Sequence, residues 1–231
     1  GHGGTVALLM KPRPQSTRAP STRERIVDTA LALFNRQGYG AVSTAMLAAE
    51  CGIAEGNLWY HFKTRAALLD AIGERFGEAI EARLTLRPGG DPAGDYAAYL
   101  AELMAEFRAF RFLYRDQQAY GEQAEIVRGN APRWLEMTFD QIEAYLAALV
   151  EAGLLDWPRE RLRDLAINAT IILRYGLEHY RELGEPITEG GGAVRRTLTR
   201  HLTLFEHRLD PAAAARLRAA IAAMGAEALA A

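Results

Sequence analysis

The 231-residue sequence contains one cysteine, five histidines and no long run of apolar residues. A lone Cys51 excludes an intramolecular disulfide framework and fits a reducing cytoplasm, which is the location we expect. No stretch approaches the ~20 consecutive apolar residues of a membrane-spanning helix, so the sequence predicts no membrane association. The early apolar run Val6–Met10 is also too short for the core of a signal peptide.

Patterns that carry catalysis or metal binding are missing too. His201 and His207 lie six residues apart, which is not the spacing that places two metal ligands on one helical face, and no cysteine or carboxylate cluster joins them. The sequence has no glycine-rich phosphate loop and no nucleophile elbow. We therefore expect no catalytic residues, no metal and no cofactor.

Strand patterns are absent as well, which predicts an all-α fold. Residues 1–20, which include KPRPQSTRAP, are typical of a flexible basic arm. Ser21 and Glu24 form a capping box that starts the first helix, and Thr64 is placed to start a long fourth helix that ends near Leu86. Glycines and prolines divide the remainder into six expected helices, near 91–110, 111–129, 132–152, 158–183, 191–208 and 210–228.

Charge is unevenly distributed along the chain, although the formal net charge is only −2. Residues 1–69 carry eight Lys and Arg against four Asp and Glu, whereas the remainder carries 19 against 25. A basic head on an acidic body is expected if only the head meets nucleic-acid phosphate. Chance variation in surface charge is the alternative explanation.

The segment Ser43–Lys63, STAMLAAECGIAEGNLWYHFK, has the pattern of two short helices that cross at a tight turn. Ala48 is small where the helices would touch, and Gly52 suits the turn. Apolar residues are spaced to lock the second helix in place: Leu47, Ile53, Leu58 and Phe62. This arrangement predicts a helix-turn-helix, with an ordinary helical hairpin in a bundle as the alternative.

Residues 52–68, GIAEGNLWYHFKTRAAL, resemble the signature of the TetR family of bacterial repressors, G-V-S-x-G-x-L-Y-x-Y-F-x-[SN]-K-x-x-L. The resemblance covers about 50 residues, including the first helix and Gly38-Tyr39-Gly40. It implies a helix-turn-helix DNA-binding domain over residues 21–68 and a helical ligand-binding and dimerisation domain over residues 69–231. It also implies that residues 55–61 enter the major groove.

The predicted DNA contacts have two roles. Glu55 and Asn57 are candidates for base edges, because a carboxylate accepts from cytosine and an amide pairs with adenine. Gly56 costs its helix roughly 1 kcal/mol relative to alanine, which close approach to DNA or tight helix packing would explain. The candidates for phosphate contact are Thr44, Trp59, Tyr60, His61 and Lys63. For Trp59 packing is an equal alternative, whereas Phe62 is expected in the core.

Several positions depart from the family pattern. Ala54 replaces the usual Ser or Thr, which weakens capping there by about 1 kcal/mol. Ala45 and Met46 replace more polar residues, and Glu55 is acidic where the family often has Lys or Arg.

Aromatic residues are abundant in the larger domain, where they line a cavity or fill a core. Polar residues interrupt the apolar pattern of the expected helix 158–183, as in a small-molecule site with a few polar anchors. A dimer interface and a satisfied core are the alternatives for that stripe. The candidate pocket residues are Phe107, Phe110, Tyr114, Trp134, Asn168, Ile172, Tyr175 and His179.

The family resemblance further implies that helices 158–183 and 191–208 pack against their copies in a homodimer. Leu198, Leu202 and Phe205 are candidates for that interface, with packing inside one subunit as the alternative. We expect a regulator of transcription that binds a palindromic operator in double-stranded DNA. A repressor that a small, largely apolar effector releases is favoured. A helical protein-interaction module without DNA binding is the alternative, and an enzyme is less favoured still.

Overall fold

The structure is a computed structural model that describes residues 18–187 and 192–224. Within these residues it is helical throughout, apart from one isolated antiparallel bridge between Leu155 and Leu209. The predicted all-α class is therefore confirmed, whereas most of the basic arm 1–20 lies outside the described residues. The α-helices are α1 Thr22–Gln37, α2 Thr44–Cys51, α3 Glu55–His61, α4 Arg65–Leu84, α5 Pro92–Ala109, α6 Arg111–Arg115, α7 Gln117–Tyr120, α8 Glu125–Glu151, α9 Leu162–Glu182, α10 Ala193–Leu202 and α11 Pro211–Ala223. Three 3₁₀ turns accompany them: η1 Tyr39–Ala41, η2 Arg159–Arg161 and η3 Glu206–Arg208.

Side-chain caps start α1 and α4 where the sequence predicts. The Glu24 amide donates to Ser21 Oγ at 3.1 Å, and the Ser21 amide donates to Glu24 Oε2 at 3.3 Å. Thr64 caps α4 by accepting from the Ala67 amide. Gly52 ends α2 in the left-handed conformation, φ 69°, which few other residues adopt without strain.

The middle of the chain differs from the prediction. A break was expected near Pro132, but α8 runs through Pro132 without interruption. The break falls earlier, where Gly121 and Ala124 both have positive φ and separate α7 from α8. Pro132 removes the helical donor for the carbonyl of Arg128, and both residues are exposed, so water replaces that bond at low cost.

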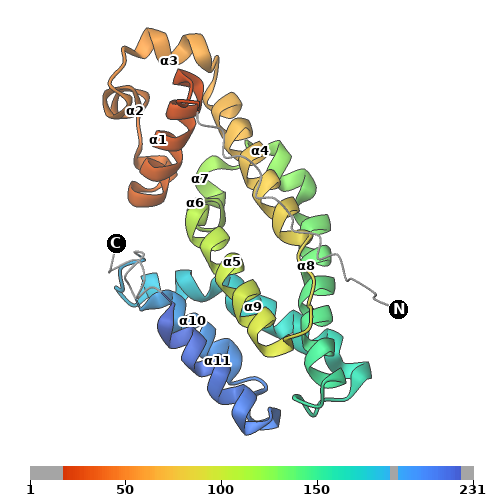
Figure 1. The fold of residues 1–231 in the computed structure, drawn as a ribbon. Coiled ribbons are helices and arrows are strands. Elements are labelled where there is room, and N and C mark those ends of the chain that lie inside the picture. The colour runs from red at the N-terminus through yellow and green to blue at the C-terminus, as the bar shows by residue number, and fades with distance from the viewer. Residues whose placement is uncertain (1–17, 188–191, 225–231) are drawn as a thin grey trace.

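Two apolar clusters hold the molecule together. One joins the head to α4, α6, α7 and the first half of α8, and the other joins α5 to α8, α9, α10 and α11. Helix α4 runs from the head alongside α8, and α10 and α11 lie toward the opposite end (Figure 1). In the second cluster Tyr96 Oη lies 2.6 Å from Nε2 of the fully buried His201. Burial lowers the pKa of His201 to about 4, so this histidine is neutral at pH 7.

None of the helices in the described part of the chain is both long enough and apolar enough to span a membrane.

Candidate nucleic-acid interface and internal cavity

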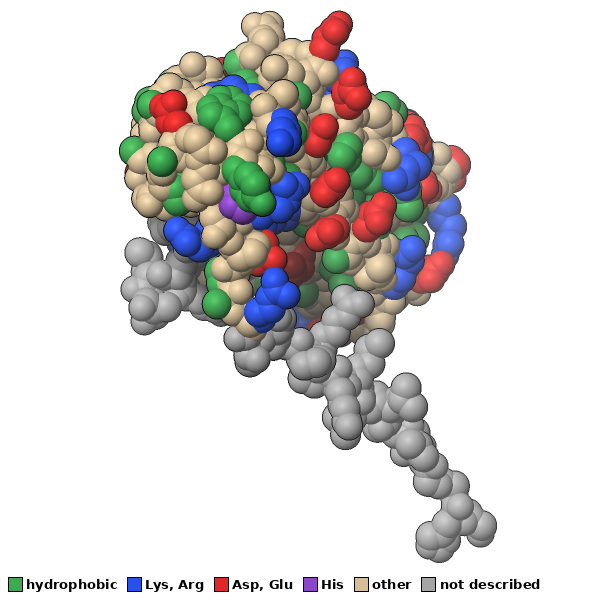
Figure 2. Space-filling model, turned by 90° about the horizontal axis from the view of Figure 1, so that it is seen from above, with side chains coloured by type: hydrophobic (Ala, Val, Ile, Leu, Met, Phe, Trp, Pro, Cys, Tyr) green, Lys and Arg blue, Asp and Glu red, His purple; other side chains and the backbone are tan. Residues whose placement is uncertain are grey.

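Helix α3 presents its polar and aromatic side chains at the free end of the head. Glu55, Asn57 and Lys63 are exposed, and Trp59 and Tyr60 leave 39% and 76% of their surfaces uncovered. Leu58 is buried and anchors the other side of the helix. Figure 2 looks down on this end, where exposed hydrophobic groups, a histidine and basic side chains gather. A face of this composition suits base edges and phosphates.

Gly56 lies on the exposed side of α3, and a Cβ built there would meet no described atom within 4 Å. Tight helix packing therefore does not explain this glycine. Of the two explanations that the sequence offered, only close approach to an external surface such as DNA is left.

The other predicted contact residues lie at the edge of this face. Thr44 and His61 are half-buried, and Arg23 donates to the His61 carbonyl at 3.0 Å. Phe62 is buried, as predicted, and its ring packs under the Arg23 guanidinium. The sequence reasoning did not select Met46, which is 38% exposed at the start of α2. Ser43 caps α2 just before it, and exposure near that cap is the only feature that points to Met46 as a contact residue.

The head is fastened to α6 through the end of α1. Asn35 Nδ2 donates to the Ala109 carbonyl at 2.7 Å, and Asn35 Oδ1 accepts from the Phe112 amide at 3.1 Å. Arg115 donates to the carbonyls of Phe34 and Asn35, and it pairs with Asp116. These bonds join the C-terminus of α1 to α6.

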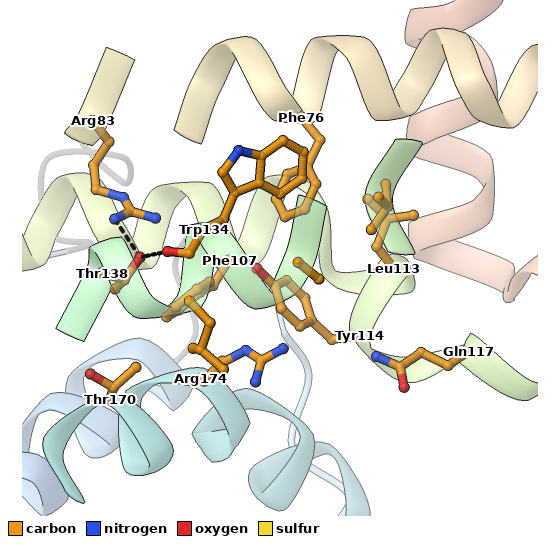
Figure 3. A pocket seen from close by; sticks show the side chains of 13 residues that line it. Phe76, Arg83, Phe107, Leu113, Tyr114, Gln117, Trp134, Thr138, Thr170 and Arg174 are labelled. Atoms are coloured by element: carbon orange, nitrogen blue, oxygen red, sulfur yellow. Dashed lines mark hydrogen bonds between the residues drawn. The ribbon is translucent and has the colours of Figure 1, made fainter. Parts of the chain in front are cut away.

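An inner cavity of about 70 Å³ lies on the other side of α6. It is bounded by α4, α5, α6, α7, α8 and α9, and its walls carry four aromatic side chains (Figure 3). The lining residues are Phe76, Arg83, Phe107, Leu113, Tyr114, Gln117, Val127, Ala131, Trp134, Leu135, Thr138, Thr170 and Arg174. Phe107, Tyr114 and Trp134 were predicted here, whereas the other lining residues were not.

An outer cavity of about 450 Å³ adjoins the inner one. The two share Gln117, Ala131 and Arg174 among their walls, and Tyr120, Arg128 and Pro132 line only the outer part. The inner space alone holds little more than a few water molecules.

Trp134 connects the inner cavity directly to α4. The indole packs on the backbone of α4 at Gly77, where a Cβ would lie 3.1 Å from the indole ring. One turn earlier, a Cβ on Gly73 would lie 3.2 Å from Val127 Cγ2. A displacement of Trp134 toward α4 therefore presses on the helix that leads into the head.

A buried polar network closes the far end of the inner cavity. Arg83 forms a two-bond pair with Glu106, at 3.2 and 2.9 Å, and also donates to Thr138 and Gln141. Burial raises the pKa of Glu106, and the charge and hydrogen bonds of Arg83 oppose that rise. Every Arg83 donor group has an acceptor, so this pair links α4, α5 and α8 as a neutral unit.

Five of the predicted pocket residues lie elsewhere. Asn168, Tyr175 and His179 are exposed and Ile172 is half-buried, all on the outward side of α9. Phe110 lines a separate surface cavity beside Leu86. The spacing of 3–4 residues was correct for a helical stripe, but α9 has two such stripes, and Leu165, Ala169 and Leu173 form the buried one.

The three predicted interface residues are also placed differently. Leu198, Leu202 and Phe205 are 0–1% exposed within a single chain. They belong to the core around α5 and α9, so packing inside the subunit, the alternative explanation, is what the structure has. They are too deeply buried to contact a second copy.

A helix-turn-helix head joined to a larger helical body is the architecture of a DNA-binding regulator. Comparison with known families agrees. Residues 26–72 match the family model described as bacterial regulatory proteins, tetR family, and residues 75–217 match the model described as bacterial transcriptional repressor, TetR. The chain belongs to the TetR family of bacterial transcriptional regulators.

Individual relatives match over part of their length. The chain is 28% identical to the transcriptional regulator AcrR of Shigella flexneri, over 62% of this chain and 71% of that protein. It is 31% identical to the class C tetracycline repressor of Escherichia coli, over 57% and 54%. The crystal structure of a TetR-family regulator from Marinobacter aquaeolei VT8 has the same fold, with a TM-score of 0.72 and 22% identity over 90% and 98% of the two chains.

Proposed function

We propose that the protein is a homodimeric repressor that binds a palindromic operator in the bacterial cytoplasm and leaves it when a small molecule enters the internal cavity. The observation that carries the proposal is the shared position of α6, which holds the head on one side and lines the cavity on the other.

Operator binding rests on the exposed face of α3. Glu55 and Asn57 reach base edges, and Gly56 allows the backbone of the helix to approach the groove. Tyr60 on the same helix, and Lys63 and the half-buried Thr44 beside it, contact phosphates. Ala45 and Met46 leave fewer polar groups on α2, so α3 carries most of the base recognition.

Release from DNA follows from the two connections between cavity and head. An effector that widens the inner cavity pushes Trp134 against α4 and displaces Tyr114 with α6. Both movements change the orientation of the head. Two recognition helices whose separation no longer equals one turn of DNA, roughly 34–36 Å, cannot bind the operator together. By linkage, the effector must bind the displaced state more tightly than the docked state.

The dimer surface is the outward stripe of α9. Ile171 and Tyr175 leave 51% and 46% of their surfaces exposed, and Leu183 leaves 64%. Apolar residues at this spacing, together with Asn168 and His179, form a seam suited to a two-fold partner helix. Burial of the same stripe in a second copy explains why a large aromatic ring is left uncovered in one chain.

Selection of bound sequences from random duplex DNA tests the proposal. A palindromic site and affinity that falls steeply between 50 and 200 mM salt are expected, as for a protein that neutralises several phosphates. Lys63→Gln removes one phosphate contact and lowers the salt slope by about 1. Arg161→Gln, at an exposed arginine beside α9, is the matched control and leaves the slope unchanged. Binding without sequence preference would contradict the repressor, and no DNA binding at all would favour the protein-interaction module.

A further inference from the structure

The two adjoining cavities are cationic, although the larger domain as a whole has an excess of acidic residues. Their described walls contain no Asp or Glu, whereas Arg83, Arg128 and Arg174 all contribute to them. Glu106 neutralises Arg83, whereas Arg128 donates to the backbone carbonyl of Glu122 at 2.8 Å and pairs with no carboxylate among the described residues. The space therefore carries positive charge where a guest would enter.

Arg174 is the centre of that charge. It lies on α9 where the inner and outer cavities meet, and its guanidinium lies 5.6 Å from the centroid of the Tyr114 ring (Figure 3). Its hydrogen bond within the described residues goes to Tyr175 Oη at 3.2 Å, and no described carboxylate pairs with it. The acid one turn further along α9, Glu178, is already paired with Arg181 at 2.8 Å.

Donors without acceptors surround the same space. The Trp134 indole nitrogen is buried and has no partner among the described residues. Burial raises the pKa of Tyr114, so its hydroxyl stays protonated, and that hydroxyl points into the space between Trp134 and Phe107 (Figure 3). By contrast, the hydroxyls of Thr138 and Thr170 already donate to helix carbonyls. The groups in the cavity that lack a partner are therefore donors, and a ligand that binds them must supply an acceptor.

We infer that the effector is a small organic anion, a carboxylate on a compact apolar or aromatic body. The inference rests on the proposed function and specifies the ligand class of its cavity. The carboxylate receives hydrogen bonds from Arg174 in the manner typical of guanidinium and carboxylate groups. The body packs between Trp134, Phe76 and Phe107 in the inner cavity, which must widen to admit a ring.

The test uses matched sets of probes that differ only in the charged end. Each set contains a carboxylate, its primary amide and the amine of equal chain length, built on phenylacetate, 3-phenylpropionate, 4-phenylbutyrate, hexanoate and octanoate. Calorimetry on the full chain measures binding to wild type, to Arg174→Gln and to the exposed control Arg161→Gln. Thermal unfolding of each variant checks that it is folded.

At least one carboxylate is expected to bind wild type and Arg161→Gln roughly tenfold to a hundredfold more tightly than its own amide, with the amine weakest. Arg174→Gln should lose that preference while it binds the amide as wild type does. Equal binding of carboxylates and amides, no binding by any carboxylate, or a preference that survives in Arg174→Gln would each overturn the inference.

Operator binding without ligand is measured on the same preparations, because it separates the two ideas. A chain that binds its operator but shows no preference for carboxylates keeps the proposed function and loses only the ligand class. A chain that binds carboxylates through Arg174 but no DNA keeps the anion site and contradicts the repressor.

Discussion

Truncation of Tyr175 should separate assembly of the dimer from folding of the subunit. Tyr175 leaves 46% of its surface exposed on α9. An aromatic side chain buries roughly 200 Å² when fully enclosed, so about 90 Å² of Tyr175 is available to a partner. At ~25 cal/mol per Å² this area is worth about 2 kcal/mol.

A two-fold interface contains the residue twice, which doubles the loss in Tyr175→Ala to about 4 kcal/mol of association free energy. The dimer dissociation constant should therefore rise roughly a thousandfold. Tyr175→Phe is the matched control, because it removes the hydroxyl that accepts from Arg174 but keeps the ring. It should dimerise like wild type.

Sedimentation velocity of labelled protein from nanomolar to micromolar concentrations measures the effect. Leu198→Ala should affect folding and not assembly. Truncation of this buried residue should lower the free energy of unfolding by about 2–5 kcal/mol and leave the surface of the subunit unchanged. If Tyr175→Ala stays dimeric at the wild-type concentration, the outward stripe of α9 is not the interface and the reasoning fails.

Three further predictions concern the head, the core and their connection. Gly56→Ala should raise the unfolding free energy by up to about 1 kcal/mol and weaken operator binding, since the added methyl meets only DNA; unchanged affinity in a binding titration would contradict this. His201 has a folded pKa of about 4 against 6.5 unfolded, so the unfolded chain takes up the proton first as pH falls and stability is lost from pH 6.5 downward. Urea unfolding should show a loss of about 2 kcal/mol from this group between pH 7.5 and 5, which His201→Gln abolishes and the exposed control His207→Gln retains. Asn35→Ala leaves the Phe112 amide without its acceptor and should cost about 2 kcal/mol of unfolding free energy, with faster hydrogen exchange at that amide; normal protection there would show that the contact does not hold α6.

Features that depend on residues close together in the sequence, such as helix boundaries, were predicted best. Ser21, Gly52 and Thr64 bound helices through contacts within four residues, and the structure has each of them. The break expected at Pro132 was wrong because the cost of a proline depends on whether water reaches the freed carbonyl, which is a property of the whole fold.

The candidate site was harder to predict because periodicity gives the spacing of a helical face and not its direction. On α9, Asn168, Ile172 and Tyr175 have the spacing of an inner face but lie outside, while Arg174 lies at the cavity. An arginine in an apolar helix is usually a surface residue, so nothing local marked it. The buried positions of Leu198 and Phe205 likewise depend on how α10 packs between α9 and α11.

The contact between Gly77 and Trp134 means that a single substitution can reproduce the effect of a ligand. Because a single methyl group at residue 77 would lie 3.1 Å from the indole, Gly77→Ala installs inside the fold part of the pressure that an effector applies from the cavity. The added methyl group would then act on α4 in place of an effector. A mutation of one base in the gene would then weaken operator binding in the absence of any effector.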